Sequence, residues 1–385
     1  MSSRRRPLRV ALIAPHRHRV REPFAGGLEA HVWHLARRLR QLGHQVLLMA
    51  PEGSDGADPR YAFPREGWRA SALAEADVSM PPREFLAAHH AYLRVMLALS
   101  RELAGEVDVV HNHALHHLPV AMAPSLPMPM LTTLHTPPTP WMESAVDLGP
   151  RAASTDRSRP TIRFAAVSDY TADAWQALPE RPVVVRNGVD LRDWPFGAGG
   201  DWLVWSGRLV PEKAPHLAVD AARLAGLRLR LAGPISDPDY FAQEIAPRLG
   251  QDVRYVGHLA HAELAELVGR SAASLVTPRW DEPFGLVVAE SLACGTPVAA
   301  FRRGGIPEVV GGPEHGALVA PDDVTALAAA LPAVLGLDRR RVRRYAEAEL
   351  SVGHMADSYV RLYDDLLAGR WHSPDDVVRP LRVGA

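Results

Sequence analysis

The first half of the chain alternates short apolar runs with longer stretches in which apolar residues recur at helical spacing. Leu8 to Ala14 is almost continuously apolar and predicts a buried strand. Apolar residues then recur every three or four positions from Leu28 to Leu42, opposite a row of arginines, and Gly43 ends this predicted helix. Gln45–Ala50 is the next apolar run. A strand, a helix and a strand in this order predict a parallel sheet with right-handed crossovers.

The same alternation continues through the rest of this half. Further strands are predicted at Val107–His111, Met130–His135, Phe164–Val167 and Pro182–Val185, with helices around residues 83–104 and 169–178. The stretch from Thr136 to Ser158 is rich in proline and polar at its ends, so we expect a long loop there.

A second cycle starts at Trp202. Strands are predicted at Trp202–Ser206, Leu227–Ala232, Val253–Val256, Ala273–Thr277, Val298–Phe301 and Ala317–Val319. Helices are predicted at Pro215–Leu224, Tyr240–Leu249, Ala262–Gly269, Pro283–Ala293, Asp323–Leu335, Asp338–Leu350 and Met355–Ala368. Asp193–Gly200 indicates a hinge. The pattern predicts two doubly wound α/β domains, residues 1–192 and 193–355, followed by a helical segment over residues 356–385.

Composition fits this organisation and excludes several classes of function. The chain has 385 residues, enough for two cores, and its net charge of −1 gives no basic field for nucleic acid. Its single cysteine, Cys294, cannot form an internal disulfide and is expected to be a small core residue. There is no run of eighteen apolar residues and no signal-peptide pattern. We expect a cytoplasmic protein with at most peripheral membrane contact; the sequence specifies no oligomeric state.

The clearest chemical signal is the segment from Trp280 to Val298, WDEPFGLVVAESLACGTPV. Glu282 and Glu290 lie eight positions apart where a loop runs into a predicted helix, and Pro283 suits its first turn. A helix start presents free N–H groups that favour a phosphate. Eight helical positions span roughly 12 Å. That is about the separation of sugar and ribose in a nucleotide sugar, so one acid could hold each, with the helix start between them.

A second segment carries two cations. Ser206-Gly-Arg-Leu-Val-Pro-Glu-Lys213 lies between the first strand of the second domain and the following helix. An arginine fork and a lysine point charge can neutralise a leaving diphosphate without a metal. Two surface cations on a loop are the alternative interpretation.

Glycines and histidines near predicted strand ends are weaker signals. Gly26-Gly27 precedes the first helix and either lets the backbone approach a ligand or forms a flexible turn. His135 follows a strand, where a lone histidine is more often structural. His111, His113, His116 and His117 form an H-x-H-x-x-H-H spacing that fits no metal motif with nearby thiols or carboxylates. We expect no metal there, and we expect His113 to line the acceptor side of the cleft between the domains.

Together these strings resemble retaining glycosyltransferases of family 4, which have the GT-B fold. EPFG, Glu290 and ACGTPV match the family's E-x7-E motif, Gly207 to Lys213 its G-R-x-x-x-E-K signature, and Gly26 to Glu29 its G-G-x-E string. The resemblance implies two Rossmann-like domains facing across a cleft, with the donor mostly on the second and the acceptor on the first. It also implies that the last helix returns to the first domain.

The resemblance also implies roles for individual residues. Arg208 and Lys213 would contact the diphosphate, Glu282 the sugar hydroxyls and Glu290 the ribose. His135 would contact the donor sugar near the reacting carbon. The remaining predicted binding residues are placed by their position in the matched strings: Gly26 and Gly27 near phosphate or acceptor, Gly305 of Gly304-Gly305-Ile-Pro-Glu308 close to the donor, His258 and Leu259 at the base, and Phe284, Gly285 and Leu286 at the helix start.

The predicted reaction moves a sugar from a nucleotide diphosphate sugar to a hydroxyl of a small molecule, glycan or lipid. We expect a uridine diphosphate sugar first and guanosine diphosphate mannose second, retention of the anomeric configuration, and neither metal nor other cofactor. A nucleotide-sugar epimerase and a non-catalytic nucleotide-sugar-binding protein stay open as alternatives. A nicotinamide dehydrogenase would need G-x-G-x-x-G after the first strand, where this chain has APHRHRV.

Overall fold

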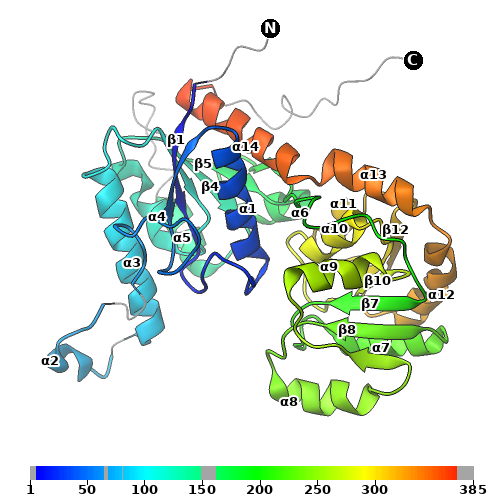
Figure 1. Ribbon diagram of the computed structural model, residues 1–385. Helices are drawn as coiled ribbons and strands as arrows, with labels where there is room; N and C mark the ends of the chain where they lie inside the picture. The colour runs from blue at the N-terminus through cyan, green and yellow to red at the C-terminus, as the bar shows by residue number, and fades with distance from the viewer. Residues whose placement is uncertain (1–5, 65–67, 80, 149–161, 371–385) are drawn as a thin grey trace, which may run out of the picture. The chain divides into compact units, whose positions relative to one another are not determined.

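The computed structural model describes residues 6–64, 68–79, 81–148 and 162–370. The chain divides into two compact units. Unit 1 comprises the residues up to Val167, Thr171–Val185 and the residues from Ala356 onward. Unit 2 comprises Ser168–Tyr170 and Arg186–Met355. Each unit contains one six-stranded sheet (Figure 1), and every strand pair in both sheets is parallel.

The sheet of unit 1 has the order β2-β1-β3-β4-β5-β6. Its strands are β1 (Arg9–Ile13), β2 (Gln45–Met49), β3 (Val109–Asn112), β4 (Met130–Leu134), β5 (Ile162–Ala166) and β6 (Val183–Val184). Its helices are α1 (Gly27–Gln41), α2 (Ala72–Glu75), α3 (Arg83–Ser100), α4 (His117–Met122), η1 (Ala123–Ser125), α5 (Pro140–Leu148), the larger part of α6 (Asp169–Ala174) and most of α14 (Val352–Leu367). The strands predicted for this half are confirmed within one or two residues.

Alternate residues of each strand enter different layers of the unit 1 core. Ala11 and Ile13 of β1 pack in a cluster with residues of α3, α4 and α5. Val10 and Leu12, which alternate with them, are also buried but lie outside that cluster. Both faces of the sheet are therefore covered, as a doubly wound fold requires.

The sheet of unit 2 has the order β12-β11-β10-β7-β8-β9. Its strands are β7 (Trp202–Ser206), β8 (Arg228–Ala232), β9 (Val253–Tyr255), β10 (Ser274–Val276), β11 (Val298–Phe301) and β12 (Gly316–Val319). Counted within the unit, this is the dinucleotide-binding strand order 3-2-1-4-5-6. The strand order reverses between β7 and β10, and sheets of this kind bind ligands in the crevice beyond the carboxyl ends of these two strands.

Helices cover both faces of this second sheet. They are α7 (Pro215–Leu224), α8 (Pro238–Tyr240), η3 (Phe241–Ile245), η4 (Ala246–Arg248), α9 (His261–Gly269), α10 (Leu286–Ala293), α11 (Ile306–Val310), α12 (Val324–Leu335) and α13 (Arg339–Glu349). In Figure 1, α9 lies on one side of β7 and β8, and α7 on the other. None of the helices in the described residues combines the length and apolarity needed to cross a bilayer.

Two predicted segments differ from the structure. Residues 140–148 of the expected loop Thr136–Ser158 form α5, whose Met142, Ala145 and Val146 are buried against unit 1; residues 149–158 lie outside the described residues. The single helix predicted at Tyr240–Leu249 is instead a helical turn, a π-helical turn and a 3-10 turn. Pro247 accounts for this break, because it has no N–H to continue an α-helical hydrogen-bond ladder.

Candidate active site

The loops that follow β7 and β10 meet at the switch point of the unit 2 sheet. Residues 207–214 follow β7, and residues 277–285 follow β10. The backbone N–H of Arg279 donates to the carbonyl of Glu212 at 2.9 Å, and the Thr277 hydroxyl donates to the carbonyl of Ala214 at 3.0 Å. Ala214 has a φ of +46° where the first loop turns into α7. These contacts hold together the loop that carries Arg208 and Lys213 and the loop that carries Glu282, at the carboxyl ends of β7 and β10.

Lys213 and Glu282 form an ion pair in this crevice. The indole N–H of Trp280 donates to the same carboxylate oxygen, Glu282 Oε1, at 3.0 Å. The Lys213 ammonium lies 4.9 Å from the centre of the Trp280 ring. Glu282 is buried, so these contacts fix the position of its carboxylate. Trp280 was not among the predicted site residues, although it opens the motif two positions before Glu282.

Arg208 is the second predicted cation and is held less tightly. Its guanidinium lies 3.6 Å from the Glu212 carboxylate, and its side chain is 47% exposed. A half-exposed guanidinium at the carboxyl end of β7 can turn toward an anion at little energetic cost.

The helix with the second glutamate begins later than predicted. Gly285 is the N-cap of α10 with a φ of +97°, and no side chain caps this helix. Pro283 therefore lies in the loop rather than in the first helical turn, and the helical-rise estimate of the distance between Glu282 and Glu290 does not hold. The uncapped N–H groups of Leu286 and Val287 suit a phosphate, as the sequence predicted for a helix start.

Glu290 lies inside α10, and Cys294 is its C-cap. Burial raises the pKa of the Glu290 carboxyl to about 7, so both protonation states are populated near neutral pH. Cys294 is fully buried, which confirms its predicted role as a core residue.

Gly304 and Gly305 hold the backbone of the Glu282 loop. A Cβ at Gly304, whose φ is +53°, would lie less than 3.0 Å from the Glu282 carbonyl, and one at Gly305 would lie 2.5 Å from the Pro283 carbonyl. The Gly305 N–H donates to the Glu282 carbonyl at 2.7 Å, and the Ser168 hydroxyl donates to the Pro283 carbonyl at 2.5 Å. Gly305, predicted to lie close to the donor, thus directly supports the loop that carries Glu282.

The predicted base-binding residues follow β9. His258 is exposed and comes after Gly257, whose φ is +92°. The Gly233 N–H donates to the Gly257 carbonyl at 2.9 Å and ties this loop to the one after β8. Leu259 is half-buried, as is Leu286 at the start of α10. The ring of Phe284 is buried, so only its backbone can serve a ligand.

In unit 1, the remaining predicted residues lie at the equivalent edge of the sheet. Gly26 is the N-cap of α1 in extended conformation, and Gly27 is the first helical residue. A Cβ at Gly26 would lie 3.0 Å from the Glu29 carboxylate. His135 follows β4 directly, and its Nε2 lies 2.9 Å from Nδ1 of His113.

His113 is fully buried and contacts His135, so the expectation that it lines the cleft was wrong. Beside it, Nε2 of His111 is 2.8 Å from the Thr133 hydroxyl, and Nδ1 is 2.6 Å from the Tyr363 hydroxyl of α14. Burial lowers the pKa of His111, His113 and His135 well below the ordinary value, so all three rings are neutral. Through the contact with His113, this buried network fixes the position of the His135 ring.

Histidines of unit 1 also form two groups that could hold a metal ion. Ring nitrogens of His31, His113 and His135 all lie within 4.8 Å of one another, and so do those of His89, His116 and His117. Neutral imidazoles suit zinc and its neighbours. Spacing along the chain does not show either group, because each takes its histidines from more than one element of the fold.

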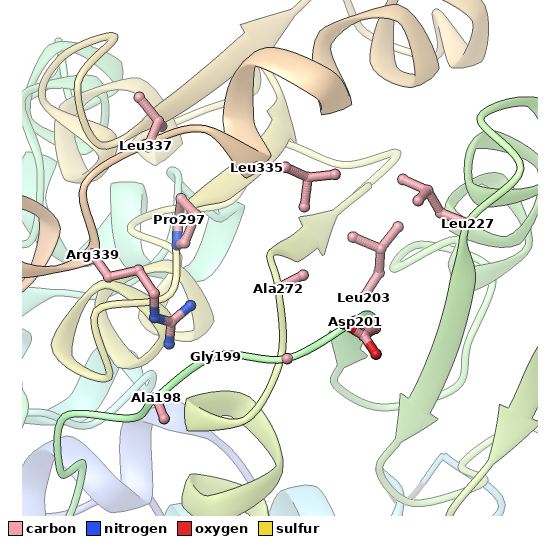
Figure 2. Close-up of a pocket in the computed structure, with 11 residues that line it drawn as sticks. Ala198, Gly199, Asp201, Leu203, Leu227, Ala272, Pro297, Leu335, Leu337 and Arg339 are labelled. Carbon is pink, nitrogen blue, oxygen red and sulfur yellow. The ribbon is translucent and has the colours of Figure 1, made fainter.

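A cavity of about 460 Å³ in unit 2 lies at the opposite edge of the sheet (Figure 2). Four of its lining residues directly precede strands: Asp201 before β7, Leu227 before β8, Ala272 before β10 and Pro297 before β11. The Arg339 guanidinium beside it already donates to the carbonyls of Gly197, Gly269 and Ser271. The cavity is therefore separate from the switch-point crevice.

Comparisons with known proteins identify the family of the chain. Residues 192–349 match the family described as Glycosyl transferases group 1, and residues 25–193 match the family described as Glycosyltransferase Family 4. The glycogen synthase of Mycobacterium tuberculosis is 33% identical over 84% of this chain and 85% of its own length. The phosphatidyl-myo-inositol mannosyltransferase of Mycobacterium leprae is 30% identical over 93% and 96%.

Solved structures share the fold. The crystal structure of Alr3699/HepE from Anabaena in complex with UDP-glucose matches with a TM-score of 0.66 at 20% identity, covering 93% of this chain and all of that one. This likeness confirms the predicted fold class of two doubly wound α/β domains.

Proposed function

Since the chain belongs to glycosyltransferase family 4, as its motifs predicted, and has the GT-B fold, we propose that it transfers a sugar from a uridine diphosphate sugar to an acceptor hydroxyl, with retention and without a metal. The observation that carries the proposal is the switch-point crevice of unit 2. There Lys213, Glu282 and Trp280 contact one another, Arg208 is half-exposed, and α10 presents an uncapped start.

In this proposal the cations serve the leaving group. Lys213 and Arg208 neutralise the diphosphate, and the N–H groups of Leu286 and Val287 bind its oxygens. Two cationic side chains and a helix start supply the positive charge that a metal ion supplies in other transferases, so the reaction needs no metal ion. Glu282 accepts hydrogen bonds from the sugar hydroxyls, and Glu290 from the ribose.

The same contacts favour retention by attack on the leaving-group face. Glu282 is ion-paired to Lys213 and accepts from Trp280, which makes it a poor nucleophile for a covalent intermediate. Instead, the bond from the anomeric carbon to the diphosphate breaks, the acceptor oxygen bonds to that carbon, and its proton passes to the departing phosphate. His135, neutral and held by His113, orients the sugar.

The choice of donor draws support from related proteins. The Anabaena protein of the same fold binds UDP-glucose, which supports a uridine diphosphate sugar. The mycobacterial relative is a mannosyltransferase, which keeps guanosine diphosphate mannose as the second candidate.

The test is a panel of nucleotide sugars incubated with the purified protein and mixed acceptors in EDTA. We expect nucleoside diphosphate release that depends on acceptor, and a product whose anomeric configuration by NMR equals that of the donor. An isomerised donor without acceptor would identify an epimerase, and tight donor binding without any turnover would identify a binding protein. Inversion at the anomeric carbon would contradict the proposed mechanism.

A further inference from the structure

Five rings from three segments of unit 1 form a cluster that we call the ring platform: Phe85, His89, His116, His117 and Trp141. His117 stacks on His116, with centroids 4.3 Å apart, and on Trp141 at 5.6 Å. Phe85 lies 5.8 Å from Trp141, and His89 lies 6.0 Å from His116. The platform joins α3, the start of α4 and the start of α5.

The platform is open to solvent. Trp141 is 62% exposed, an unusual exposure for a tryptophan, and the other four rings are half-buried. In the described residues no lysine or arginine lies over a platform ring; such cations lie over other rings.

His116 also carries an unused hydrogen-bond donor. Its Nδ1 accepts from the Leu118 N–H at 3.2 Å, so the neutral ring has its proton on Nε2. In the part of the chain that the structure describes, this buried Nε2 has no partner. A buried unpaired donor is costly, and an oxygen atom would satisfy it, whereas a metal ion would need the lone pair that this tautomer lacks.

The platform lies at the same sheet edge as the histidines of the candidate site. His116 comes three residues after His113, which follows β3, and Trp141 comes six residues after His135, which follows β4. Because carboxyl ends of parallel strands share one edge, the platform and His135 both belong to the ligand-binding edge of unit 1.

We propose that the ring platform is an acceptor subsite for a neutral glycan. A sugar ring has an apolar C–H face and a rim of hydroxyls, which match the exposed Trp141 ring and the unpaired Nε2–H of His116. A phosphorylated polyol or a phospholipid headgroup would call for a cation, and among the residues that the structure describes no lysine or arginine lies over a platform ring. The inference rests on the proposed transferase function for its role, although the binding itself can be measured separately.

The test compares Trp141→Ala with Trp68→Ala. Trp68 is a matched control, because it is 50% exposed in the same unit and stacks on His90 rather than on the platform. Binding of maltoheptaose, mannopentaose and inositol 1-phosphate is measured by saturation-transfer NMR and calorimetry, without donor. We expect wild type to bind a neutral oligosaccharide, Trp141→Ala to bind it roughly tenfold more weakly, and Trp141→Phe and Trp68→Ala to retain binding.

Several outcomes would overturn the subsite. These are no binding of either neutral oligosaccharide, equal binding by Trp141→Ala, a preference for inositol 1-phosphate, or a zinc-saturated platform that binds no glycan. With an active donor, Trp141→Ala should raise the KM for the acceptor and leave the KM for the donor unchanged. Failure of the proposed function has a different signature, since oligosaccharide would bind at Trp141 while no nucleotide sugar supported transfer.

Discussion

Lys213 and Glu282, 69 residues apart in sequence, form an ion pair that joins the loops after β7 and β10. Their side chains are only 22% and 12% exposed, so the pair is mostly removed from water. In this structure each charge satisfies the other. We infer that a bound diphosphate competes for Lys213 and frees Glu282 for sugar hydroxyls, which couples donor binding to the arrangement of the acid.

The ion pair predicts different outcomes for the two cations. Lys213→Ala should reduce kcat roughly 100-fold and also destabilise the protein by about 1–2 kcal/mol, because it leaves the buried Glu282 without its cation. Arg208→Ala should reduce kcat comparably but leave Tm unchanged, because Arg208 is half-exposed. Steady-state kinetics and thermal unfolding check both variants. Near-normal transfer by both variants would contradict the assignment of Lys213 and Arg208 to the diphosphate. Equal losses of Tm would contradict the expectation that only Lys213 stabilises the fold.

Glu290 predicts a pH dependence of stability. Its pKa rises from an ordinary value of 4.5 in the unfolded chain to about 7 in the fold, so its contribution to stability is fully present below pH 4.5 and is lost as pH rises through 7. Glu290→Gln stays neutral and should raise Tm by roughly 5 °C at pH 8, with no change at pH 4.5. Thermal unfolding at the two pH values measures this, and an equal effect at both would show that the carboxyl does not titrate in this range.

The same residue predicts the opposite trend for nucleotide binding. Ribose hydroxyls donate to an ionised carboxylate, so wild-type affinity for uridine diphosphate should rise as pH passes through 7. Glu290→Gln should bind the nucleotide about tenfold more weakly at pH 8 and lose this pH dependence. Calorimetric titration gives both quantities. If Glu290→Gln lowers the rate of transfer from the bound donor more than it weakens nucleotide binding, the ribose contact is contradicted.

Local patterns predicted the elements of the sheet well. β7, α7 and β11 have the predicted bounds, because a buried strand or an amphipathic helix shows its apolar spacing within a few residues. The start of α10 was missed, since tertiary contacts decide it. Gly304 and Gly305 hold residues 282 and 283 in an extended loop, although Pro283 would suit a helix start.

The sequence did not show which site residues contact one another, because these contacts join segments that are distant along the chain. The Lys213–Glu282 pair, the bond from Trp280, and the approach of His31, His113 and His135 depend on which strand ends meet at the switch points. Motif resemblance named most of these residues individually, but no spacing along the chain indicates their partners.

The glycine pair predicts a sharp steric effect. Gly304→Ala should lower Tm and activity together, because its Cβ would collide with the Glu282 carbonyl and its φ is positive. We expect a loss of about 2 kcal/mol or more in unfolding free energy and at least a tenfold loss of kcat. Gly250→Ala is the matched control, because a Cβ there meets nothing within 4 Å. Normal transfer by a folded Gly304→Ala protein would show that the loop tolerates the displacement.

Metal ions provide the last prediction. If Lys213, Arg208 and the start of α10 carry the diphosphate charge, EDTA should leave the transfer rate unchanged. Added zinc at tens of micromolar should inhibit, because His113 and His135 would coordinate it together with His31 and withdraw His135 from the sugar. Magnesium should not inhibit, since it prefers oxygen ligands.

His31→Asn should weaken the zinc effect, whereas His89→Asn, which alters the other histidine group, should keep the same fractional inhibition. Loss of activity in EDTA with recovery on adding zinc would reverse the conclusion and make the histidine group a required metal centre.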